Sequence, residues 1–418
     1  MPSQPSTDPA ASAARPSGPT HAPYLALLGA PPVFEAPLHV GRPNIGDRAR
    51  FMSRVEKILD SAWLTNNGPY VRDFERRVAE LAGTRNAIAM CNATIALEIV
   101  IRALGLKGEV IVPSFTFVAT AHALQWQEIK PIFCDVDPAT HNLDPRRVEE
   151  LITPETTGII GVHVWGRPCA IEQLQEIADR RGLQLMFDAA HALGCSHGGR
   201  PIGSFGRAEV FSFHATKVCN SFEGGMVTTD DDELAEKLRL MRNFGFAGKD
   251  SVIYLGSNGK MSEVSAAMGL TSLDGFEDFR AHNAAMHAAY SEGLAGLPGL
   301  QLIEYDETES NNHQYVVVEV DGSVAPLNRD ELVRVLEAEG VLARRYFYPG
   351  VHEMEPYGSY QPTAGLVLPQ TRCLSERVMT LPTGTAMHDS DVTTLCGVVH
   401  RAFDHAAEVR EHLAAEGA

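Results

Sequence analysis

The sequence predicts an α/β fold in which helices cover both faces of a large, mostly parallel sheet, with a smaller α+β domain after it. Three observations lead to this fold class. Short apolar runs alternate with segments of helical spacing in residues 87–187, a pattern typical of strands joined by right-handed helical crossovers. The chain has 418 residues, enough for two or three domains. Hydrophobic residues make up 44% of it, enough for a large core.

Two amphipathic helices are expected before the first strand. Phe51, Val55 and Ile58 recur at helical spacing within residues 45–62. A second apolar stripe predicts a helix at 71–81. The stretch LTNNGPYV between them contains an Asn-Asn-Gly turn and is expected to form a loop.

A short apolar strand at 87–90 then leads into a helix at 93–104 that opens at Asn92. A strand that turns into a helix through small polar residues leaves backbone N–H groups free at the positive end of the helix dipole. Such a turn favours a phosphate ligand. A plain helix N-cap is the alternative interpretation of the same residues.

Strands continue to alternate with helices up to the middle of the chain. The expected strands are 109–112, 131–136, 158–164, 183–187 and 208–213, and the expected helices are 117–125, 145–151 and 170–181. No GxGxxG follows the first strand and the chain has no GxxxxGK, so the dinucleotide-binding and P-loop classes lose support.

The remaining sequence predicts the smaller domain. A strand and an aspartate-capped helix are expected in 226–245, and a long helical stretch in 262–297 should bend near Gly275. Further strands are expected at 314–320 and 342–346, and further helices at 328–339 and 388–415. The expected division is a disordered tail at 1–35, a large domain at 36–275 and a small C-terminal domain at 276–418.

Composition narrows the class of partner and the compartment. The chain carries 53 acidic against 35 basic residues, a net charge of −18, and no long basic run, so nucleic acid and anionic membranes are not expected as partners. Its seven cysteines are scattered without a CxxC pair or a zinc-like pattern, so no metal site is expected. Reduced cysteines and the lack of a signal peptide or an apolar run of membrane length predict a cytoplasmic protein.

The most informative residues are Asp188, in QLMFDAAHALG, and Lys217, in VFSFHATKVCNSFEGG. Each lies at the end of an apolar strand-like run, where open α/β sheets place their ligand chemistry. An acid and a lysine in this arrangement suggest pyridoxal phosphate. The lysine would form the Schiff base, and the aspartate would keep the ring nitrogen protonated so that the ring accepts electrons.

The ordered motifs of the chain extend this suggestion. The matching stretches are GPYVRDFERRVAELAG, CNATIAL, VIVPSFTFVATAHAL, PIFCDVDPATHNLD, DAAHALG, SFHATK followed by EGG, SNGKMSEVSAAMGL, and RRYFYPGVH with LPTG. In this order they resemble the DegT/StrS-type pyridoxal-phosphate-dependent nucleotide-sugar aminotransferases, a fold type I family. The resemblance covers nearly all of the chain after about residue 40, and it implies a large domain with a mostly parallel sheet of the seven-stranded type.

The resemblance also implies roles for single residues. Lys217 would be the Schiff-base lysine and proton shuttle, and Asp188 the partner of the ring nitrogen. His191 would lie near the 3′ oxygen of the cofactor, and Phe117 would stack on its ring. The phosphate would be held by the backbone around Ala93 and Thr94 and by the hydroxyl of Ser212.

Further roles concern the substrate and the assembly. Asn258 would reach the cofactor phosphate of a neighbouring subunit, which implies a homodimer with shared active sites; a helix cap is the alternative role of Asn258. Trp165, Tyr348 and His352 would line the sugar or nucleotide pocket by the same resemblance; taken alone, these residue types indicate packing.

The function implied is transfer of an amino group from L-glutamate to a keto sugar on a nucleotide, as in deoxyamino-sugar biosynthesis for natural products or cell-surface glycans. The DAAHALG and GVHVWG stretches resemble 4-aminotransferases more than 3-aminotransferases, which implies a dTDP-4-keto-6-deoxyhexose as substrate. The alternatives are a 3-keto sugar aminotransferase, a pyridoxal-phosphate-dependent sugar dehydratase, and a non-catalytic regulatory protein of the same fold. A dehydratase of this type would carry histidine in place of Lys217, so the lysine favours transamination.

Overall fold

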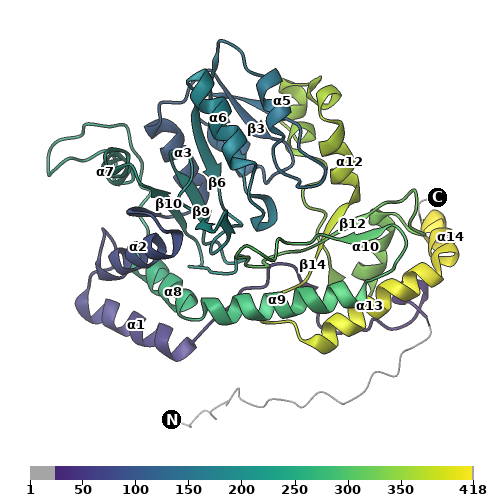
Figure 1. Cartoon of the computed structure of the whole chain (residues 1–418). Coiled ribbons are helices and arrows are strands. Elements are labelled where there is room, and N and C mark those ends of the chain that lie inside the picture. Colours follow the sequence, from purple (N-terminus) through teal and green to yellow (C-terminus); the bar gives the residue numbers. More distant parts are fainter. Residues whose placement is uncertain (1–23, 417–418) are drawn as a thin grey trace, which may run out of the picture.

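The computed structural model describes residues 24–416, and a seven-stranded sheet forms its centre (Figure 1). The strand order is β2-β10-β9-β6-β5-β3-β4. The strands are β2 (Asn86–Met90), β10 (Gly225–Thr229), β9 (Glu209–Ser212), β6 (Gln184–Asp188), β5 (Thr156–Val162), β3 (Glu109–Pro113) and β4 (Lys130–Cys134). β10 runs antiparallel to both of its neighbours, and the pairs from β9 to β4 are parallel. The expected mostly parallel α/β sheet is confirmed.

Helices cover both faces of this sheet because alternate residues of its strands are buried in two separate cores. One core packs α2 (Pro69–Ala82), α6 (Ile171–Arg181) and α8 (Glu263–Asp274) on the face that carries Phe187 and Phe211. The other packs α3 (Ala93–Ala103), α4 (Ala119–Gln125) and α7 (Asp232–Met241) on the opposite face. The helices α1 (Arg48–Ser61) and α5 (Pro145–Glu150) complete this layer structure.

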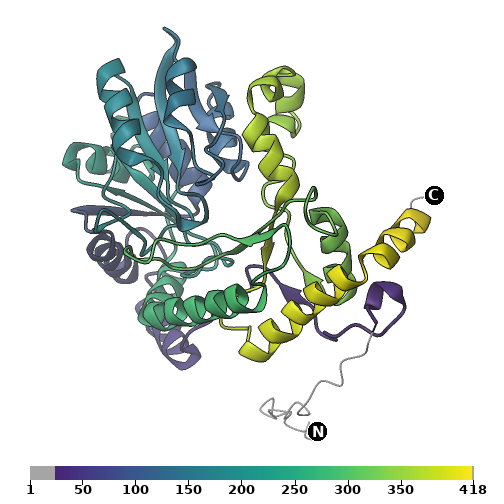
Figure 2. The ribbon, with the colours of Figure 1, turned by 45° about the vertical axis from the view of Figure 1, so that its right-hand side comes forward.

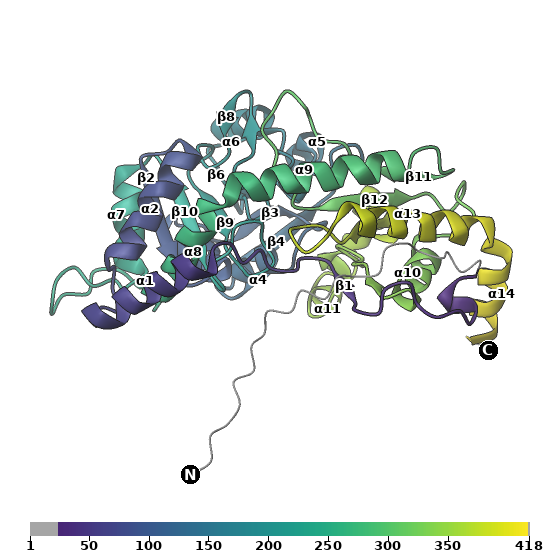
Figure 3. The same ribbon diagram turned by 90° about the horizontal axis from the view of Figure 1, so that it is seen from below.

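The C-terminal part forms a second, smaller layer beside the first (Figure 2). Its three-stranded antiparallel sheet has the order β11-β12-β14. The strands are β11 (Leu300–Leu302), β12 (Val316–Val320) and β14 (Val378–Leu381), and the principal helices are α9 (Phe276–Gly293), α10 (Arg329–Ala338), α12 (Pro369–Arg377), α13 (Asp389–Asp404) and α14 (Ala406–Glu416). Helices α9 and α13 lie side by side (Figure 3) and share the apolar core of this part.

The expectation of a disordered tail through residue 35 is wrong for residues 24–35, and residues 1–23 lie outside the described part. Leu25 is fully buried in the core of the small domain, next to the short helix η1 (Ala26–Leu28). The carboxylate of Glu339 accepts hydrogen bonds from the backbone N–H groups of Ala26 (2.8 Å) and Val33 (3.0 Å). One acidic side chain far along the chain therefore fixes this segment, and the Pro- and Ser-rich composition gave no sign of that contact.

The large domain also starts later than residue 36. Strand β1 (Leu38–His39) pairs in parallel with β13 (Val341–Leu342), which places it against the small domain. The large domain core begins with the helices that follow. At the other boundary, α8 ends and α9 begins at Gly275.

Two element predictions in the small domain are wrong in detail. The helix expected over 388–415 is two helices, because His405 has a non-helical backbone (φ −104°, ψ 22°) that ends α13 before α14 starts. The strand expected at 342–346 stops at Leu342, and only Arg344 makes a further isolated bridge, to Thr380. The chain then turns toward the large domain. Within residues 24–416, no helix is long and apolar enough to cross a membrane.

Candidate active site

Asp188 is the last residue of β6, and the sheet register places it beside Val210 of β9. Its carboxylate is buried; the hydroxyl of Thr120 donates to Oδ2 at 2.9 Å, and the backbone N–H of Ala190 donates to Oδ1 at 3.1 Å. Burial raises the pKa of Asp188, while these two hydrogen bonds and the charge of Lys217 act against that rise. A carboxylate with two donors still has acceptor capacity for a cationic N–H partner.

Lys217 lies in the turn that follows β9, where its backbone N–H donates to the carbonyl of His214. Its side chain opens onto the same cavity as Asp188, and its Nζ lies 3.5 Å from the hydroxyl of Tyr315. Desolvation lowers the pKa of Lys217 to about 8, although Asp188 and Tyr346 favour the charged form. A lysine with this pKa interconverts readily between ammonium and amine near neutral pH, which suits both a nucleophile and a proton carrier.

The helix α3 begins directly after β2, at the edge of the same cavity. Asn92 is its N-cap, and its side-chain oxygen accepts from the N–H of Ile95 at 2.8 Å. Ala93 and Thr94 line the cavity, and the first N–H groups of a helix have no partner within it. Strand β10 crosses here at Gly225, where an added Cβ would lie 2.5 Å from the carbonyl of Asn92. The cap and an anion-binding helix start are therefore compatible at this turn.

A cavity of about 260 Å³ joins the acid, the amine and the helix start. The residues predicted to bind the cofactor line this cavity, apart from Asn258. They are Lys217, Asp188, Ala93, Thr94, Phe117, His191 and Ser212. This donor set fits pyridoxal phosphate: an amine for the aldehyde, a carboxylate for the ring nitrogen, and hydroxyls with a helix start for the phosphate. The close crossing at Gly225 requires glycine, because a Cβ there would clash with the backbone of Asn92 and Ala93.

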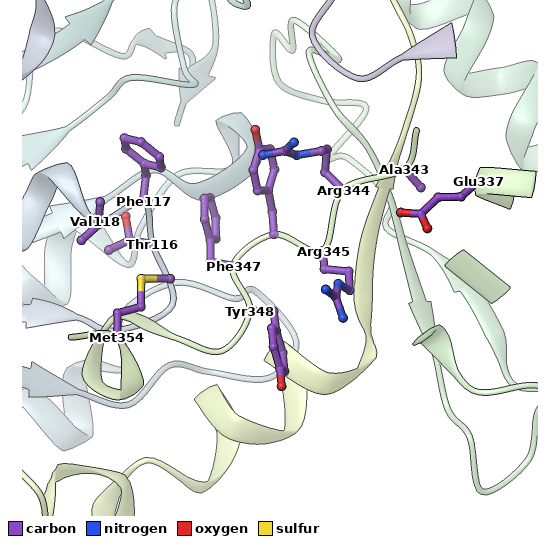
Figure 4. A pocket seen from close by; sticks show the side chains of 11 residues that line it. Thr116, Phe117, Val118, Glu337, Ala343, Arg344, Arg345, Phe347, Tyr348 and Met354 are labelled. Carbon is purple, nitrogen blue, oxygen red and sulfur yellow. The ribbon is translucent and has the colours of Figure 1, made fainter. Parts of the chain in front are cut away.

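A second cavity of about 390 Å³ adjoins the first. Figure 4 shows the side chains that line it. The two cavities share Thr116, Phe117, Tyr346 and Phe347. The other residues that line the second cavity are Val118, Glu337, Ala343, Arg344, Arg345, Tyr348 and Met354. Phe117 is 58% exposed, so its ring is free to contact a ligand in either cavity.

The two arginines of the second cavity differ in their partners. Arg345 pairs with Asp330 at 3.1 Å. Arg344 has no carboxylate within 4 Å in the described part of the chain, and its guanidinium lies 5.5 Å from the ring centre of Tyr346. Arg344 is therefore a cation next to a cavity with capacity to bind an anion.

Two of the three residues expected in the substrate pocket line neither of these two cavities. Trp165 is fully buried, and its indole N–H donates to Nδ1 of His141 at 3.1 Å. His352 is also buried, with Nδ1 at 2.7 Å from the hydroxyl of Ser114. Both residues pack behind the wall of the site, so those two assignments are wrong. Tyr348, 45% exposed, does line the second cavity.

Asn258 does not reach the cavity of its own subunit. It is exposed and forms an isolated backbone bridge with Asn243. The N-cap of the following helix α8 is Ser262, whose hydroxyl accepts from the N–H of Ser265. The cap alternative for Asn258 is therefore wrong.

Sequence reasoning missed three residues of the site. Thr120 lies in the first turn of α4, three positions after Phe117, and its hydroxyl donates to Asp188. Tyr315 precedes β12 and contacts both Lys217 and His191. Tyr346 was expected within a strand instead. Each depends on how the small domain or a loop approaches the sheet, which the local pattern does not encode.

The family model described as the DegT/DnrJ/EryC1/StrS aminotransferase family matches residues 46–400. A dTDP-4-amino-4,6-dideoxy-D-glucose transaminase of Shigella dysenteriae is 37% identical over 324 residues, which are 78% of this chain and 88% of that protein. A protein of the same name from Escherichia coli is 33% identical, over 85% of this chain and 96% of its own length.

A solved structure is similar to this chain over nearly its whole length. The crystal structure of DesI, described in the presence of its TDP-sugar product, superposes with a TM-score of 0.89 at 53% identity and covers 94% of this chain and 99% of that one. The fold is thus that of the fold type I aminotransferases that depend on pyridoxal phosphate. From these matches and the ordered site on its sheet, the chain belongs to the DegT/DnrJ/EryC1/StrS aminotransferase family.

Proposed function

We propose that the protein transfers an amino group from L-glutamate to C4 of a dTDP-4-keto-6-deoxyhexose, with pyridoxal phosphate as cofactor. The observation that carries this proposal is the convergence of Lys217, Asp188 and the start of α3 on one cavity. The names of the two curated relatives and the TDP-sugar product of DesI support the choice of nucleotide and of carbon atom.

Pyridoxal phosphate, when bound, supplies an aldehyde that condenses with amines and a ring that accepts electrons. Lys217 would hold the cofactor between turnovers. Asp188 would accept a hydrogen bond from the ring nitrogen and keep its proton in place, as its buried position and free acceptor capacity allow. Ser212 and the first N–H groups of α3, at Ala93 and Thr94, would bind the phosphate.

Lys217 also has the properties of the proton carrier. Once released, its amine can take the proton from the substrate carbon and return it, because desolvation lowers its pKa to about 8. Proton transfer by a positioned group of this kind contributes roughly 10²- to 10⁴-fold to a rate. Phe117 and Phe347 add aromatic surface to the cavity beside Lys217.

The nucleotide would occupy the second cavity. This cavity continues from the first through the shared residues Thr116, Phe117, Tyr346 and Phe347, so a sugar beside Lys217 would place its diphosphate there. Arg344 offers a guanidinium that no carboxylate within 4 Å neutralises in residues 24–416, and arginine binds phosphate oxygens in a bidentate manner. The exposed rings of Phe117 and Tyr348 offer apolar surface to the base or the deoxyribose.

The assembly completes the proposal. Asn258 would reach the phosphate of the cofactor in the neighbouring subunit, since it is exposed and lies away from the cavity of its own subunit. The protein would then be a homodimer with shared sites. Cytoplasmic localisation is part of the same proposal, supported by seven cysteines that form no disulfide in the described structure.

Two measurements test this function. Borohydride reduction of the purified protein, followed by peptide mapping, should place a pyridoxyl group on Lys217; modification of another lysine would overturn the site. A coupled assay with L-glutamate and a panel of nucleotide sugars should then show the highest kcat/KM with the 4-keto sugar on dTDP. Preference for 3-keto sugars would keep the cofactor chemistry and overturn the choice of substrate.

A further inference from the structure

Trp165 has a backbone conformation that is unusual for a large residue. It is fully buried in the short helix η2 (Val164–Gly166), yet its φ of 64° and ψ of 4° lie in the left-handed region. Residues other than glycine adopt this region at a cost in free energy, and such residues cluster at functional sites. The consequence of this conformation is that the backbone N–H of Trp165 donates to Nδ1 of His191 at 3.2 Å.

This hydrogen bond determines the tautomer of His191. Nδ1 accepts from a backbone N–H, so it carries a lone pair, and the single proton of a neutral imidazole must be on Nε2. Burial and the nearby charge of Lys217 lower the pKa of His191 well below its usual value, so the ring is neutral. The indole of Trp165 also stacks against His191 with a ring-plane angle of 19°, which fixes the plane of the imidazole.

The proton on Nε2 points toward Tyr315. Nε2 lies 3.4 Å from the hydroxyl oxygen of Tyr315, so His191 donates and the phenol accepts. The hydroxyl of Tyr315 keeps its own proton, because burial raises its pKa to about 12. Its oxygen lies 3.5 Å from Nζ of Lys217. When the lysine is a neutral amine, the phenol O–H donates to its lone pair; when it is an ammonium ion, the lysine donates instead.

We propose that Tyr315 is a positioning residue for Lys217: a hydrogen-bond chain that starts at the N–H of Trp165 passes through His191 and directs the hydroxyl of Tyr315 to the lysine nitrogen. In this arrangement the oxygen of Tyr315 is already occupied by the donor from His191, so the phenol acts best as a donor. The chain therefore stabilises the neutral amine relative to the ammonium ion and holds its nitrogen at one place in the cavity. Trp165 acts on this chain through its backbone N–H and through the stacking of its indole on His191.

Other titratable groups around Lys217 also affect the equilibrium between its amine and ammonium forms. Asp188 at the end of β6 favours the ammonium form, as does Tyr346. His191 and Tyr315 approach from the DAAHALG loop and the segment before β12, and His214 and Glu223 line the cavity as well. Removal of the Tyr315 hydroxyl leaves all of these in place, so its effect can be measured separately.

The test measures the pKa of Lys217 in the full chain after its cofactor has been released. The rate of covalent capture of added pyridoxal phosphate is followed by absorbance from pH 6 to 10. The rate rises with the fraction of Lys217 that is a free amine, so the midpoint of the pH profile gives the pKa of Lys217. The native midpoint should lie near 8. Tyr315→Phe should raise it by roughly 0.5 to 1, as expected for the loss of one hydrogen bond to the neutral form.

Matched variants separate positioning from packing. Tyr305→Phe removes a phenolic hydroxyl that bonds the carbonyls of Tyr315 (2.9 Å) and Trp165 (3.3 Å) without touching Lys217. It should leave the midpoint unchanged. His191→Gln retains a donor toward Tyr315 and should also keep the native midpoint, whereas His191→Leu should raise it.

A direct measurement reads the tautomer in the native protein and uses a variant only to assign the signal. Nitrogen NMR of histidine-labelled protein, with the His191 signal assigned by its absence in His191→Gln, should show the Nε2-protonated tautomer without titration between pH 6 and 8. The proposal is overturned by an Nδ1-protonated ring, or by a native midpoint in folded Tyr315→Phe. The inference rests on the proposed function for the identity of the amine, but the two can fail separately. Capture at a residue other than Lys217 overturns the proposed function. Capture at Lys217 with the same midpoint in Tyr315→Phe as in the native protein overturns only the hydrogen-bond chain.

Discussion

At the scale of single residues, the site depends on one buried carboxylate that is only partly satisfied. A carboxylate offers about four lone-pair positions, and Asp188 has two donors, from Thr120 and Ala190. Burying such a charge costs free energy unless a cation compensates it. Lys217 supplies part of that compensation at a distance, and a protonated ring nitrogen would supply the rest.

Asp188→Asn tests this dependence. The variant keeps the volume and both neighbouring hydrogen-bond groups but removes the negative charge, so the ring nitrogen loses the partner that holds its proton. We expect a folded protein with weaker cofactor binding and a kcat lower by several orders of magnitude. The measurement is single-turnover kinetics with L-glutamate, after circular dichroism has confirmed the fold. Near-native turnover would show that the charge of Asp188 has no part in the reaction.

Arg344→Gln tests the place of the nucleotide. Loss of a charge-assisted contact to a diphosphate should raise KM for the dTDP-sugar by roughly 10- to 100-fold, since such hydrogen bonds contribute about 1.5–3 kcal/mol. kcat and the half-reaction with glutamate should change little. Arg410→Gln is the matched control: Arg410 lies on α14 and pairs with Glu331. Equal values of KM in both variants would exclude Arg344 from the nucleotide site.

At the scale of elements, the sequence allows the large domain to be predicted well, and the site only in part. The strands β2, β3, β5, β6 and β9 are apolar runs bounded by turns, with Asp188 at the end of β6 and Lys217 in the turn after β9, so both the sheet and the edge that carries the candidate site follow from local pattern. The wrong assignments concern residues whose positions local pattern does not determine. An aromatic residue after a strand, such as Trp165, has the same signature whether it lines a pocket or packs behind it. The approach of the 342–348 segment to the sheet depends on contacts across the two domains.

Three helices of the large domain are joined at one carboxylate. Local sequence patterns do not predict this contact either. Asp274, the last residue of α8, accepts from Arg50 and Arg54 of α1 and from Arg77 of α2. Burial would raise the pKa of Asp274, but the hydrogen bonds from the three guanidinium groups outweigh it and hold the pKa below its usual value.

Asp274→Asn should therefore destabilise the fold by about 1–2 kcal/mol near neutral pH, because the arginines are partly exposed and solvent screens part of the interaction. The sign with pH follows from the lowered pKa. The stabilisation is complete above the pKa of the unfolded aspartate, about 3.9, and is lost as the pH falls through the lower folded value. Urea unfolding of both proteins at pH 7 and at acid pH measures this stabilisation. If the difference in free energy of unfolding between Asp274→Asn and the native protein grows toward acid pH, the ionised carboxylate is not its source.

At the scale of the whole molecule, the described subunit exposes apolar surface near the segment that carries Asn258. Phe244, Val252, Ile253 and Leu255 are large and exposed, in the loop between α7 and α8. A group of exposed apolar side chains is typical of a surface that another protein covers. Asn258 lies in the same loop, three residues after Leu255, so the neighbouring subunit proposed to use Asn258 would also cover these side chains. The proposed shared sites and this surface thus require the same assembly.

Mixed dimers test that assembly. If Asn258 serves the neighbouring site, Lys217→Ala and Asn258→Ala subunits combined in one dimer give one site with both defects and one site with neither, because the two residues of a site come from opposite chains. Each homodimer should be poorly active, and the mixture should regain activity approaching half of the native value per mixed dimer. Two different affinity tags allow the mixed species to be isolated before the assay. The control pairs Lys217→Ala with Asp188→Asn, whose residues line the cavity of the same subunit; that mixed dimer carries a defect in both sites and should regain nothing. If Asn258 acts only within its own subunit, the Lys217→Ala and Asn258→Ala pair should behave like this control, with one defect in each site and no native site in the dimer.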